Sequence, residues 1–293
     1  MRALFETLAA EIGRASGAPF AVKTSRAAHG GDISQAFTLS DGARRFFAKL
    51  QPAARLALFE AEAAGLAELA AAEAVRVPRV ICFGEADGHV YLVLEHLDLQ
   101  PRGDAAQLGH GLARQHRVEA AQFGGPCDNY IGATPQPNCW HARWTDFWRE
   151  HRLGFQLRLA AGNGYGGRLQ HLGEQLLAGL DAFFEGYSPR PSLLHGDLWG
   201  GNHGFLADGA PVIFDPAVYY GDRECDLAMS ELFGGFAPAF HDAYREAWPL
   251  DAGYAVRRTL YNLYHVLNHA NLFGGGYPAQ AARMIEQLLS HTR

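Results

Sequence analysis

The stretch L-L-H-G-D-L-W-G-G-N, Leu193 to Asn202, carries the most chemical information in this 293-residue sequence. An apolar run leads into one carboxylate, Asp197, and an amide, Asn202, follows five residues later on a glycine-rich turn. The next segment, H-G-F-L-A-D-G-A-P-V-I-F-D, is predicted to form a strand, a turn at Asp208-Gly209 and a second strand that ends at Asp215. Because a hairpin brings its two ends together, we expect Asn202 and Asp215 to lie side by side, with Asp197 one loop earlier.

Two carboxylates and one amide form an oxygen-rich set of the kind that binds Mg²⁺. One carboxylate is then left over to accept a proton from a hydroxyl group. Phosphoryl transfer needs these parts, and the spacing matches a kinase catalytic loop, in which H-x-D is followed five residues later by Asn and then by a metal-binding Asp. The alternative is an Asx-rich turn whose polar groups only cap the backbone. The complete ordered set favours the phosphotransferase interpretation.

A second signature lies near the N-terminus, where Lys49 ends the apolar run F-F-A-K-L. The segment from Arg55 to Ala74 has a strong helical pattern, and at 100° per residue Glu62 falls within its apolar arc. Glu60 lies at the edge of that arc, and Glu68 points away from it. Since a glutamate on a buried helix face needs a partner, we expect an ion pair between Glu62 and Lys49 that orients the lysine toward the phosphates of a nucleotide.

Two further features fit a nucleotide site in this first part of the chain. Gly30 and Gly31, in A-H-G-G-D-I-S-Q-A-F, permit close approach of the backbone to phosphate, although the motif also fits a plain hairpin turn. The backbone groups of Glu95 and Leu97, in L-V-L-E-H-L, are expected to meet the edge of an adenine, from their position alone.

The pattern of elements predicts two lobes and an α+β fold. Strand patterns and one helix fill residues 1–97, and helical patterns dominate residues 98–293, at 105–117, 144–161 and 168–185. We therefore expect a nucleotide-binding small lobe (1–97) and a mainly helical large lobe (98–293) that holds the catalytic loop, the metal site and the substrate pocket.

Composition excludes several classes of protein. The net charge of −6 argues against nucleic acid as a partner, and no apolar run approaches the length of a membrane span. The four scattered cysteines suggest neither a zinc site nor a disulfide framework, so a cytoplasmic protein is expected. The first residues fit an amphipathic helix in which Leu4, Leu8 and Ile12 share one face.

Together these motifs resemble the fructosamine kinase (ketosamine-3-kinase) family, a branch of the protein-kinase-like fold near the aminoglycoside and choline phosphotransferases. The resemblance extends from about Gly30 to Asn268. Its most specific parts are the tryptophan and two glycines after H-G-D and the loop D-N-Y-I-G-A-T-P-Q-P-N. The resemblance is also supported by the segments F-F-A-K-L, L-F-E-A-E-A-A-G-L, Y-Y-G-D-R-E-C-D-L-A-M-S-E-L-F-G-G-F and Y-N-L-Y-H-V-L-N-H.

The resemblance implies a role for each matching residue. Asp197 would be the catalytic base, Asn202 and Asp215 the Mg²⁺ ligands, and Lys49 with Glu62 the pair that orients the phosphates of ATP. Trp199 would pack on the sugar or the amine substituent of the substrate, unless it is a core aromatic under the loop.

Two further positions are judged against the family pattern. Asp226 is expected to cap the helix that follows it, and also to hold the catalytic loop from below. Some members of the family carry a cysteine where this chain has Asp32, so redox regulation at that place is doubtful.

The expected activity is ATP-dependent phosphorylation at O3 of a ketosamine, a fructosamine or a ribulosamine, which leads to deglycation of free amines or of lysines in peptides and proteins. One alternative is a related phosphotransferase that acts on an aminoglycoside, choline or another small alcohol. The other is a non-catalytic nucleotide-binding protein, against which the complete set of catalytic residues argues. The sequence leaves open the choice of sugar, the choice between free and protein-bound amine, and the oligomeric state.

Overall fold

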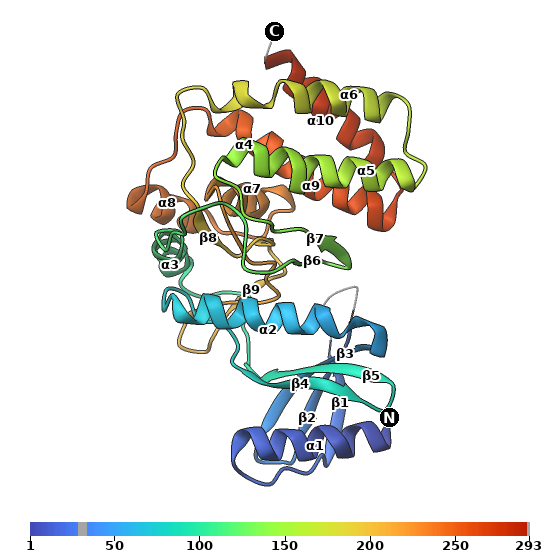
Figure 1. Ribbon diagram of the computed structural model, residues 1–293. Helices are drawn as coiled ribbons and strands as arrows, with labels where there is room; N and C mark the ends of the chain where they lie inside the picture. The colour runs from blue at the N-terminus through green and yellow to red at the C-terminus, as the bar shows by residue number, and fades with distance from the viewer. Residues whose placement is uncertain (29–33, 292–293) are drawn as a thin grey trace. The chain divides into compact units, whose positions relative to one another are not determined.

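The computed structural model describes residues 1–28 and 34–291 and divides the chain into two compact units (Figure 1). Unit 1 consists of residues 1–103 and 204–215, and unit 2 consists of residues 104–203 and 216–293. The mixed α and β composition confirms the expected α+β class, with the strands of the large sheet in unit 1 and most of the helices in unit 2. Gly30 and Gly31 lie outside the described residues.

The centre of unit 1 is a five-stranded sheet in which all neighbouring strands are antiparallel. Two turns that the sequence predicted, at Asp41-Gly42 and Asp87-Gly88, connect neighbouring strands, and their glycines adopt positive φ, as tight hairpin turns require. The order of the strands is β1 (Thr24–Ala28), β2 (Gln35–Ser40), β3 (Arg45–Pro52), β5 (His89–Glu95) and β4 (Val80–Ala86).

Two helices pack on this sheet, one on each face (Figure 1). Helix α1 (Arg2–Ser16) buries Leu4, Leu8 and Ile12, as its sequence pattern predicted, against residues of the sheet that include Ala48. Because side chains alternate along a strand, the neighbouring Lys49 points to the other face. Helix α2 (Leu56–Ala71) follows a short 3₁₀ turn at Ala53–Arg55 and covers that other face with its buried apolar arc.

A hairpin from much later in the sequence completes unit 1. Strands β9 (His203–Phe205) and β10 (Pro211–Ile213) pair with each other around the predicted Asp208-Gly209 turn, where Asp208 Oδ1 accepts a hydrogen bond from the N–H of Ala210. Phe205 exchanges two backbone hydrogen bonds with Gln100, of 2.7 and 3.0 Å. The N–H of Ile213 donates to the carbonyl oxygen of Arg76 at 3.0 Å, so both strands of the hairpin join unit 1.

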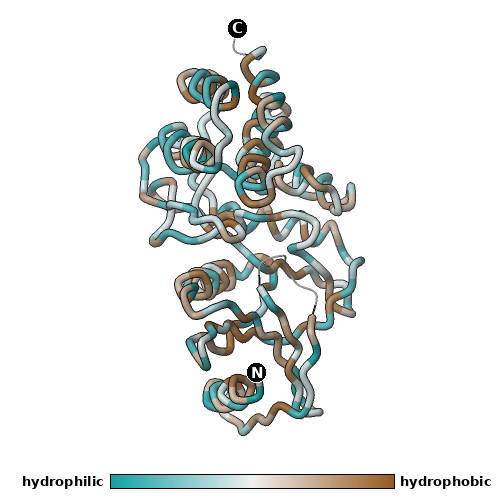
Figure 2. The backbone as a smooth tube through the Cα atoms, turned by 90° about the vertical axis from the view of Figure 1, so that its right-hand side faces the viewer, coloured by the Kyte–Doolittle hydropathy of each residue, from teal (hydrophilic) through white to brown (hydrophobic). Residues whose placement is uncertain are grey.

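Unit 2 is mainly helical, and Figure 2 shows hydrophobic and hydrophilic residues alternating along the helices, as expected for helices with one buried face. The long helix α9 buries residues along its whole length and supplies much of the core. The helices are α3 (Ala105–Gln115), α4 (Trp144–Phe147), α5 (Gly154–Gly162), α6 (Arg168–Ala178), α7 (Glu224–Leu232), α8 (Pro238–Ala247), α9 (Tyr254–Phe273) and α10 (Tyr277–His291).

Two of the predicted helices differ in detail. The helix expected at 144–161 is interrupted by a π-helix, Trp148–Leu153, between α4 and α5. The helix expected at 168–185 ends at Ala178 and is followed by a 3₁₀ segment, Leu180–Phe184. Hydrophobic periodicity located both segments but did not resolve these changes in winding, because i→i+4 and i→i+5 hydrogen bonding bury similar faces over a short length.

Two short strand pairs in unit 2 hold the segments around the candidate site. Strand β8 (Ser192–Leu194) pairs with β11 (Tyr219–Gly221), so the residues just before His195 lie beside those that follow Asp215. Strand β6 (Asn129–Ile131) pairs with β7 (Thr134–Gln136) within the glycine- and proline-rich connection. In the described part of the chain, no helix is both long and apolar enough to cross a membrane.

Candidate active site

The predicted ion pair between β3 and α2 is present. Lys49 Nζ lies 2.6 Å from Glu62 Oε1 and 2.5 Å from Asp215 Oδ1, so one ammonium group contacts two carboxylates. The Lys49 and Glu62 side chains are 6% and 10% exposed, whereas that of Asp215 is 30% exposed. All three residues belong to unit 1, because the hairpin that ends at Asp215 packs there.

The charges of this trio are strongly coupled. Burial by itself would lower the pKa of the Lys49 ammonium, but the carboxylates of Asp215 and Glu62 outweigh it and hold that pKa above its ordinary value. Burial raises the pKa of the Glu62 carboxyl more than the Lys49 charge lowers it. Lys49 therefore carries a fixed positive charge at neutral pH in a site of low solvent exposure, where its field is weakly screened.

Asp215 occupies an unusual backbone conformation. Its φ is 56°, in the left-handed region that few residues other than glycine adopt, and it directly precedes Pro216. A following proline disfavours helical conformations, so this geometry carries strain that the surrounding structure must offset. Strained backbone of this kind concentrates at functional sites, which agrees with the ligand role expected for Asp215.

The second group of predicted residues lies on the loop after β8, in unit 2. Asn202 Nδ2 donates a hydrogen bond to the Asp197 carbonyl oxygen at 2.9 Å and approaches Asp197 Oδ2 at 3.3 Å. Asn202 is buried, and the N–H of Asp197 donates to His195 Nδ1 at 3.3 Å. The structure therefore brings the expected catalytic carboxylate and one expected metal ligand together on a single tight loop.

Asp226 supports this loop from beneath. Its carboxylate accepts hydrogen bonds from the N–H of His195 at 2.7 Å and from that of Gly196 at 2.8 Å, and it also contacts His116 Nε2 at 3.1 Å. Burial by itself would raise the pKa of the Asp226 carboxyl, but these hydrogen bonds and the His116 side chain hold that pKa below its ordinary value. The prediction that Asp226 holds the catalytic loop is confirmed.

The expected capping role of Asp226 is wrong. Asp226 lies inside the first turn of α7, and the backbone N–H of Glu224, the first residue of that helix, is instead bonded by the Asp222 side chain. A carboxylate near a helix start cannot be assigned from sequence to the cap or to another contact, because several acidic residues crowd this segment.

The glycines of the motif are explained by close approaches. Gly196 has φ of 82°, and a Cβ there would overlap the carbonyl oxygen of Ala217. A Cβ on Gly200 would lie 2.6 Å from the carbonyl oxygen of Gly234, and one on Gly201 would overlap the Trp199 ring. The ring of Trp199 is 39% exposed, so Trp199 is not the core aromatic that the sequence left as an alternative.

The loop with the sequence D-N-Y-I-G-A-T-P-Q-P-N forms a buried amide network that sequence analysis did not foresee. Gln136 Nε2 donates to Asn129 Oδ1 at 2.8 Å and to the Ala217 carbonyl oxygen at 3.2 Å. Asn129 Nδ2 donates to the Val218 carbonyl oxygen at 2.7 Å, and Gln136 Oε1 accepts from the Tyr264 hydroxyl at 2.7 Å. The loop thus fixes the backbone two and three residues after Asp215.

Arg152, in the π-helix, completes this network and was also missed. Its guanidinium donates to the Pro137 carbonyl oxygen and to Asn138 Oδ1, both at 2.7 Å, and lies 4.1 Å from the centre of the Tyr219 ring. Arg152 is fully buried. Its only sequence signal is a cation within an otherwise apolar helical pattern, which is not enough to identify its partners.

Glu95 and Leu97 stand at the end of β5 and just beyond it. The N–H of Glu95 donates to the Arg79 carbonyl oxygen at 2.9 Å, and the Glu95 carboxylate accepts from the N–H of Arg79 at 3.0 Å. The Leu97 carbonyl oxygen accepts a hydrogen bond from the N–H of Leu99 at 3.1 Å. The N–H of Glu95 is therefore already used within the sheet.

Comparison with known sequences identifies the family. The sequence model described as fructosamine kinase matches residues 4–291, which is almost the entire chain. The chain belongs to the fructosamine kinase family. It is 48% identical over 298 aligned positions to a probable ketoamine kinase of Synechocystis, with 97% of each chain covered. It is 41% identical to a chloroplastic protein-ribulosamine 3-kinase of Arabidopsis thaliana, with 89% of this chain and 81% of the plant protein covered.

Solved structures agree with this assignment. A Haemophilus somnus crystal structure described as a fructosamine-3-kinase superposes with a TM-score of 0.90 at 29% identity and covers 98% of each chain. An aminoglycoside phosphotransferase in complex with AMP-PNP and hygromycin B has a TM-score of 0.61 at 17% identity, with 97% of this chain and 98% of that chain covered. The second likeness shows a shared kinase-like fold and carries no information about the substrate.

Proposed function

We propose that this protein transfers the γ-phosphate of ATP to the 3-hydroxyl group of ketosamines. Membership of the fructosamine kinase family supports a kinase that acts on a sugar hydroxyl. The plant relative is named for position 3 of a protein-bound ribulosamine, and other relatives are named for ketoamines. The substrates would be fructosamine or ribulosamine units on small amines or on lysines of peptides and proteins, and the reaction would lead to deglycation.

The observation that carries the proposal is the contact of Lys49 with both Glu62 and Asp215. This arrangement presents a permanent cation beside a carboxylate that is itself partly exposed, which suits a nucleotide phosphate and its metal ion. Lys49, oriented by Glu62, would contact the phosphates of ATP. Gly30 and Gly31 would approach those phosphates through their backbone, and Glu95 and Leu97 would meet the adenine edge.

Asp215 and Asn202 fit a Mg²⁺ site in the chemistry of their donor atoms, since carboxylate and amide oxygens are the ligands that this ion prefers. Asn202 donates through Nδ2 to Asp197, so its amide oxygen would be the metal ligand. The ion, when bound, neutralises charge on the phosphates. The protein would act in a reducing compartment such as the cytoplasm, in which its four cysteines would stay free.

Asp197 would act on the acceptor. Its carboxylate, held by the Asn202 amide and by a loop tethered to Asp226, would take the proton of the sugar hydroxyl as the oxygen attacks the γ-phosphorus. The exposed ring of Trp199, two residues later, offers an apolar face on which a sugar or an amine substituent can pack. These two residues would define the acceptor side of the reaction.

The test is release of ADP by the purified protein with Mg-ATP and a panel of acceptors: fructose-lysine, ribulose-lysine, a simple fructosyl amine, kanamycin and choline. We expect turnover on ketosamines alone. Asp197→Ala should reduce kcat about 10²- to 10⁴-fold, because it removes the general base, while binding of ATP persists. Asp242→Ala, which changes an exposed aspartate on α8, is the matched control and should retain full activity.

Each outcome decides between the candidate functions. Turnover of kanamycin or choline in place of ketosamines would reject the proposed acceptor in favour of the related phosphotransferases. Binding of ATP with no turnover on any acceptor would contradict catalysis and favour a nucleotide-binding role. Turnover by Asp197→Ala close to that of the unchanged protein would reject Asp197 as the base.

A further inference from the structure

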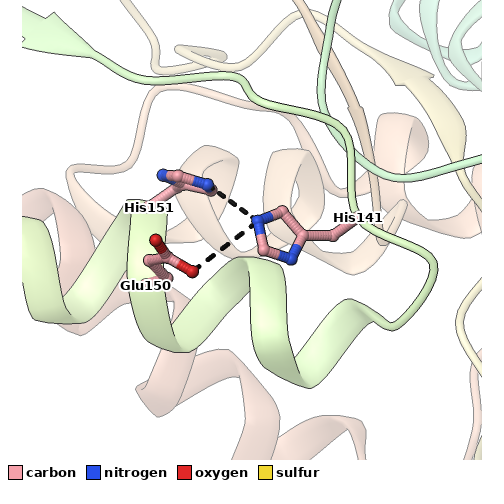
Figure 3. A group of neighbouring side chains, drawn as sticks. All are labelled: His141, Glu150 and His151. Carbon is pink, nitrogen blue, oxygen red and sulfur yellow. Dashed lines mark hydrogen bonds and ion pairs between the residues drawn. The ribbon is translucent and has the colours of Figure 1, made fainter.

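A group of three metal-binding side chains lies in unit 2 outside the residues assigned to phosphoryl transfer (Figure 3). His141 Nε2 lies 2.8 Å from His151 Nε2 and 3.8 Å from Glu150 Oε2. The three ligand atoms lie within 4.8 Å of one another. Figure 3 shows the His151 and Glu150 side chains converging on His141 from one side of a helix.

The fold holds these side chains in place from two directions. His141 lies in an extended segment and exchanges two backbone hydrogen bonds with Phe123, of 2.8 and 2.9 Å. Glu150 and His151 lie in the π-helix. The wider turn of a π-helix separates successive residues by a smaller angle than an α-helix does, so two neighbouring side chains can face the same ligand. The buried ring of Phe147 packs beside both imidazoles.

The contact between the two imidazoles indicates the chemistry of the site. A hydrogen bond between two Nε2 atoms requires one of them to lack a proton, and an unprotonated imidazole nitrogen is a metal ligand. Two histidine nitrogens bound to tetrahedral Zn²⁺ at 2.0–2.1 Å are about 3.3 Å apart, so a separation of 2.8 Å needs to widen by only about 0.5 Å. The glutamate oxygen is already close enough to turn toward such an ion.

We propose that His141, Glu150 and His151 bind one divalent transition-metal ion, and that Zn²⁺ fits best. Two imidazoles and one carboxylate are a set of three protein ligands that Zn²⁺ accepts, with water in the fourth position. Mg²⁺ prefers oxygen ligands in an octahedron and does not fit this set. The side chains of His141 and Glu150 are 22% and 61% exposed, so an ion from solvent can reach the site.

The ion would link two segments that other contacts already connect. His141 follows the T-P-Q-P-N loop by three residues, and the π-helix also carries Arg152, which bonds Pro137 and Asn138. Metal binding would therefore fix the end of that loop against the helix. This role is structural, and it does not depend on the proposed kinase activity.

The test uses the full chain without a histidine tag, freed of metal with a chelator that is then removed. Zn²⁺ is titrated by calorimetry in excess Mg²⁺, and Co²⁺ is titrated in parallel by its visible absorption, which is intense in tetrahedral sites. Glu150→Gln changes an exposed side chain and His151→Gln removes one imidazole. His171→Gln, on α6, changes an exposed histidine outside the group and is the matched control.

We expect the unchanged protein and His171→Gln to bind one equivalent of Zn²⁺ and to give the tetrahedral Co²⁺ spectrum. Loss of a residue that only orients a ligand weakens metal binding about 10- to 100-fold, so loss of a ligand should weaken it at least about tenfold. A Zn²⁺ concentration about 100 times the Kd should raise Tm by about 5 °C, and Glu150→Gln and His151→Gln should lose this rise.

Three results would overturn the site. One is the absence of stoichiometric Zn²⁺ binding to the unchanged protein, which would leave the two histidines as a hydrogen-bonded pair. Another is equal binding by Glu150→Gln, His151→Gln and the control, which would place the ion elsewhere. The third is an octahedral Co²⁺ spectrum that neither variant alters. Tm values in chelator verify that each variant is folded before its binding is compared.

Discussion

At the scale of the residue, Lys49 joins two carboxylates that come from distant parts of the chain. Glu62 is 13 positions away and Asp215 is 166 positions away, yet both contact the same ammonium group. The cation offsets two neighbouring negative charges, and in the proposed mechanism it also faces the phosphates of ATP. Stability and activity should therefore depend on the same residue.

Replacing Lys49 with methionine tests this dependence. The change keeps an unbranched apolar side chain one atom shorter than lysine and leaves Glu62 and Asp215 without their shared cation. Breaking a buried ion pair in this way costs about 3–5 kcal/mol. Chemical denaturation should show a loss of that order, together with loss of Mg-ATP binding. Lys23→Met, at an exposed lysine, should change neither quantity. Equal stability of the two variants would show that the trio contributes little to folding.

His265, on α9, gives a prediction for pH. Burial lowers the pKa of this imidazole to about 3, whereas an unfolded chain has a histidine pKa of about 6.5. Between these values the unfolded state binds the extra proton, so the contribution of His265 to stability is complete above about pH 6.5 and is lost as the pH falls. The loss is about 1.4 kcal/mol for each pH unit.

Unfolding of the His265→Gln variant measures that loss. From pH 6 to pH 4 its free energy of unfolding should fall by about 2–3 kcal/mol less than that of the unchanged protein. His171→Gln, at an exposed position, should follow the unchanged protein. Parallel curves for His265→Gln and the unchanged protein would show that His265 takes up its proton in the folded state.

At the scale of the element, the conformation of the loop after β8 depends on a glycine at position 196. Gly196 has a positive φ, and a Cβ there would overlap the carbonyl oxygen of Ala217, so Gly196→Ala must displace the loop that carries Asp197. We expect kcat to fall at least about tenfold and stability by about 1–3 kcal/mol. In Gly162→Ala, on α5, the added methyl group meets open space, and Ala favours the helix, so activity should persist. Unchanged kcat in Gly196→Ala would show that catalysis does not depend on the native conformation of this loop.

The sequence predicted those elements whose signals are local. Asp-Gly turns identified three hairpins, and the apolar arc of α2 identified Glu62 rather than Glu60 or Glu68 as the partner of Lys49. It did not reveal the π-helix or the partners of Arg152, because a change of winding and a buried guanidinium depend on residues that lie far away in sequence. For the same reason the amide network of Asn129 and Gln136 could not be inferred from the loop composition.

At the scale of the whole molecule, the chain leaves unit 1 after Gly103 and returns to it from Gly204 to Asp215. The sequence placed a boundary near Leu97 and assigned everything beyond it to the large lobe, since hydrophobic patterns carry no information on which distant strands pair. The returning hairpin brings Asp215 to Lys49. A small lobe built from residues 1–103 alone would therefore lack Asp215, one of the two carboxylates that contact the Lys49 ammonium group.

This discontinuity gives a prediction about fragments. Residues 1–103 alone lack the hairpin, which buries Phe205, Val212 and Ile213. A single chain that joins 1–103 to 204–215 through a short Gly/Ser linker restores these contacts, and the close contact between Gly103 and Phe205 shows that a short linker suffices. Each of these apolar side chains contributes about 1.5–3 kcal/mol when buried, so the joined chain should be several kcal/mol more stable than 1–103.

Chemical denaturation of the two fragments measures this difference, and the control is the joined chain with the same twelve residues in scrambled order. The native hairpin forms two backbone hydrogen bonds with Gln100 and one with Arg76. A scrambled segment keeps backbone donors and acceptors, but it misplaces the buried apolar side chains and the carboxylate that contacts Lys49. Stabilisation by the native order alone would therefore show that the small unit is built from two separate parts of the sequence. Equal stability of all three chains would mean that 1–103 folds on its own and that the hairpin adds nothing measurable to its stability.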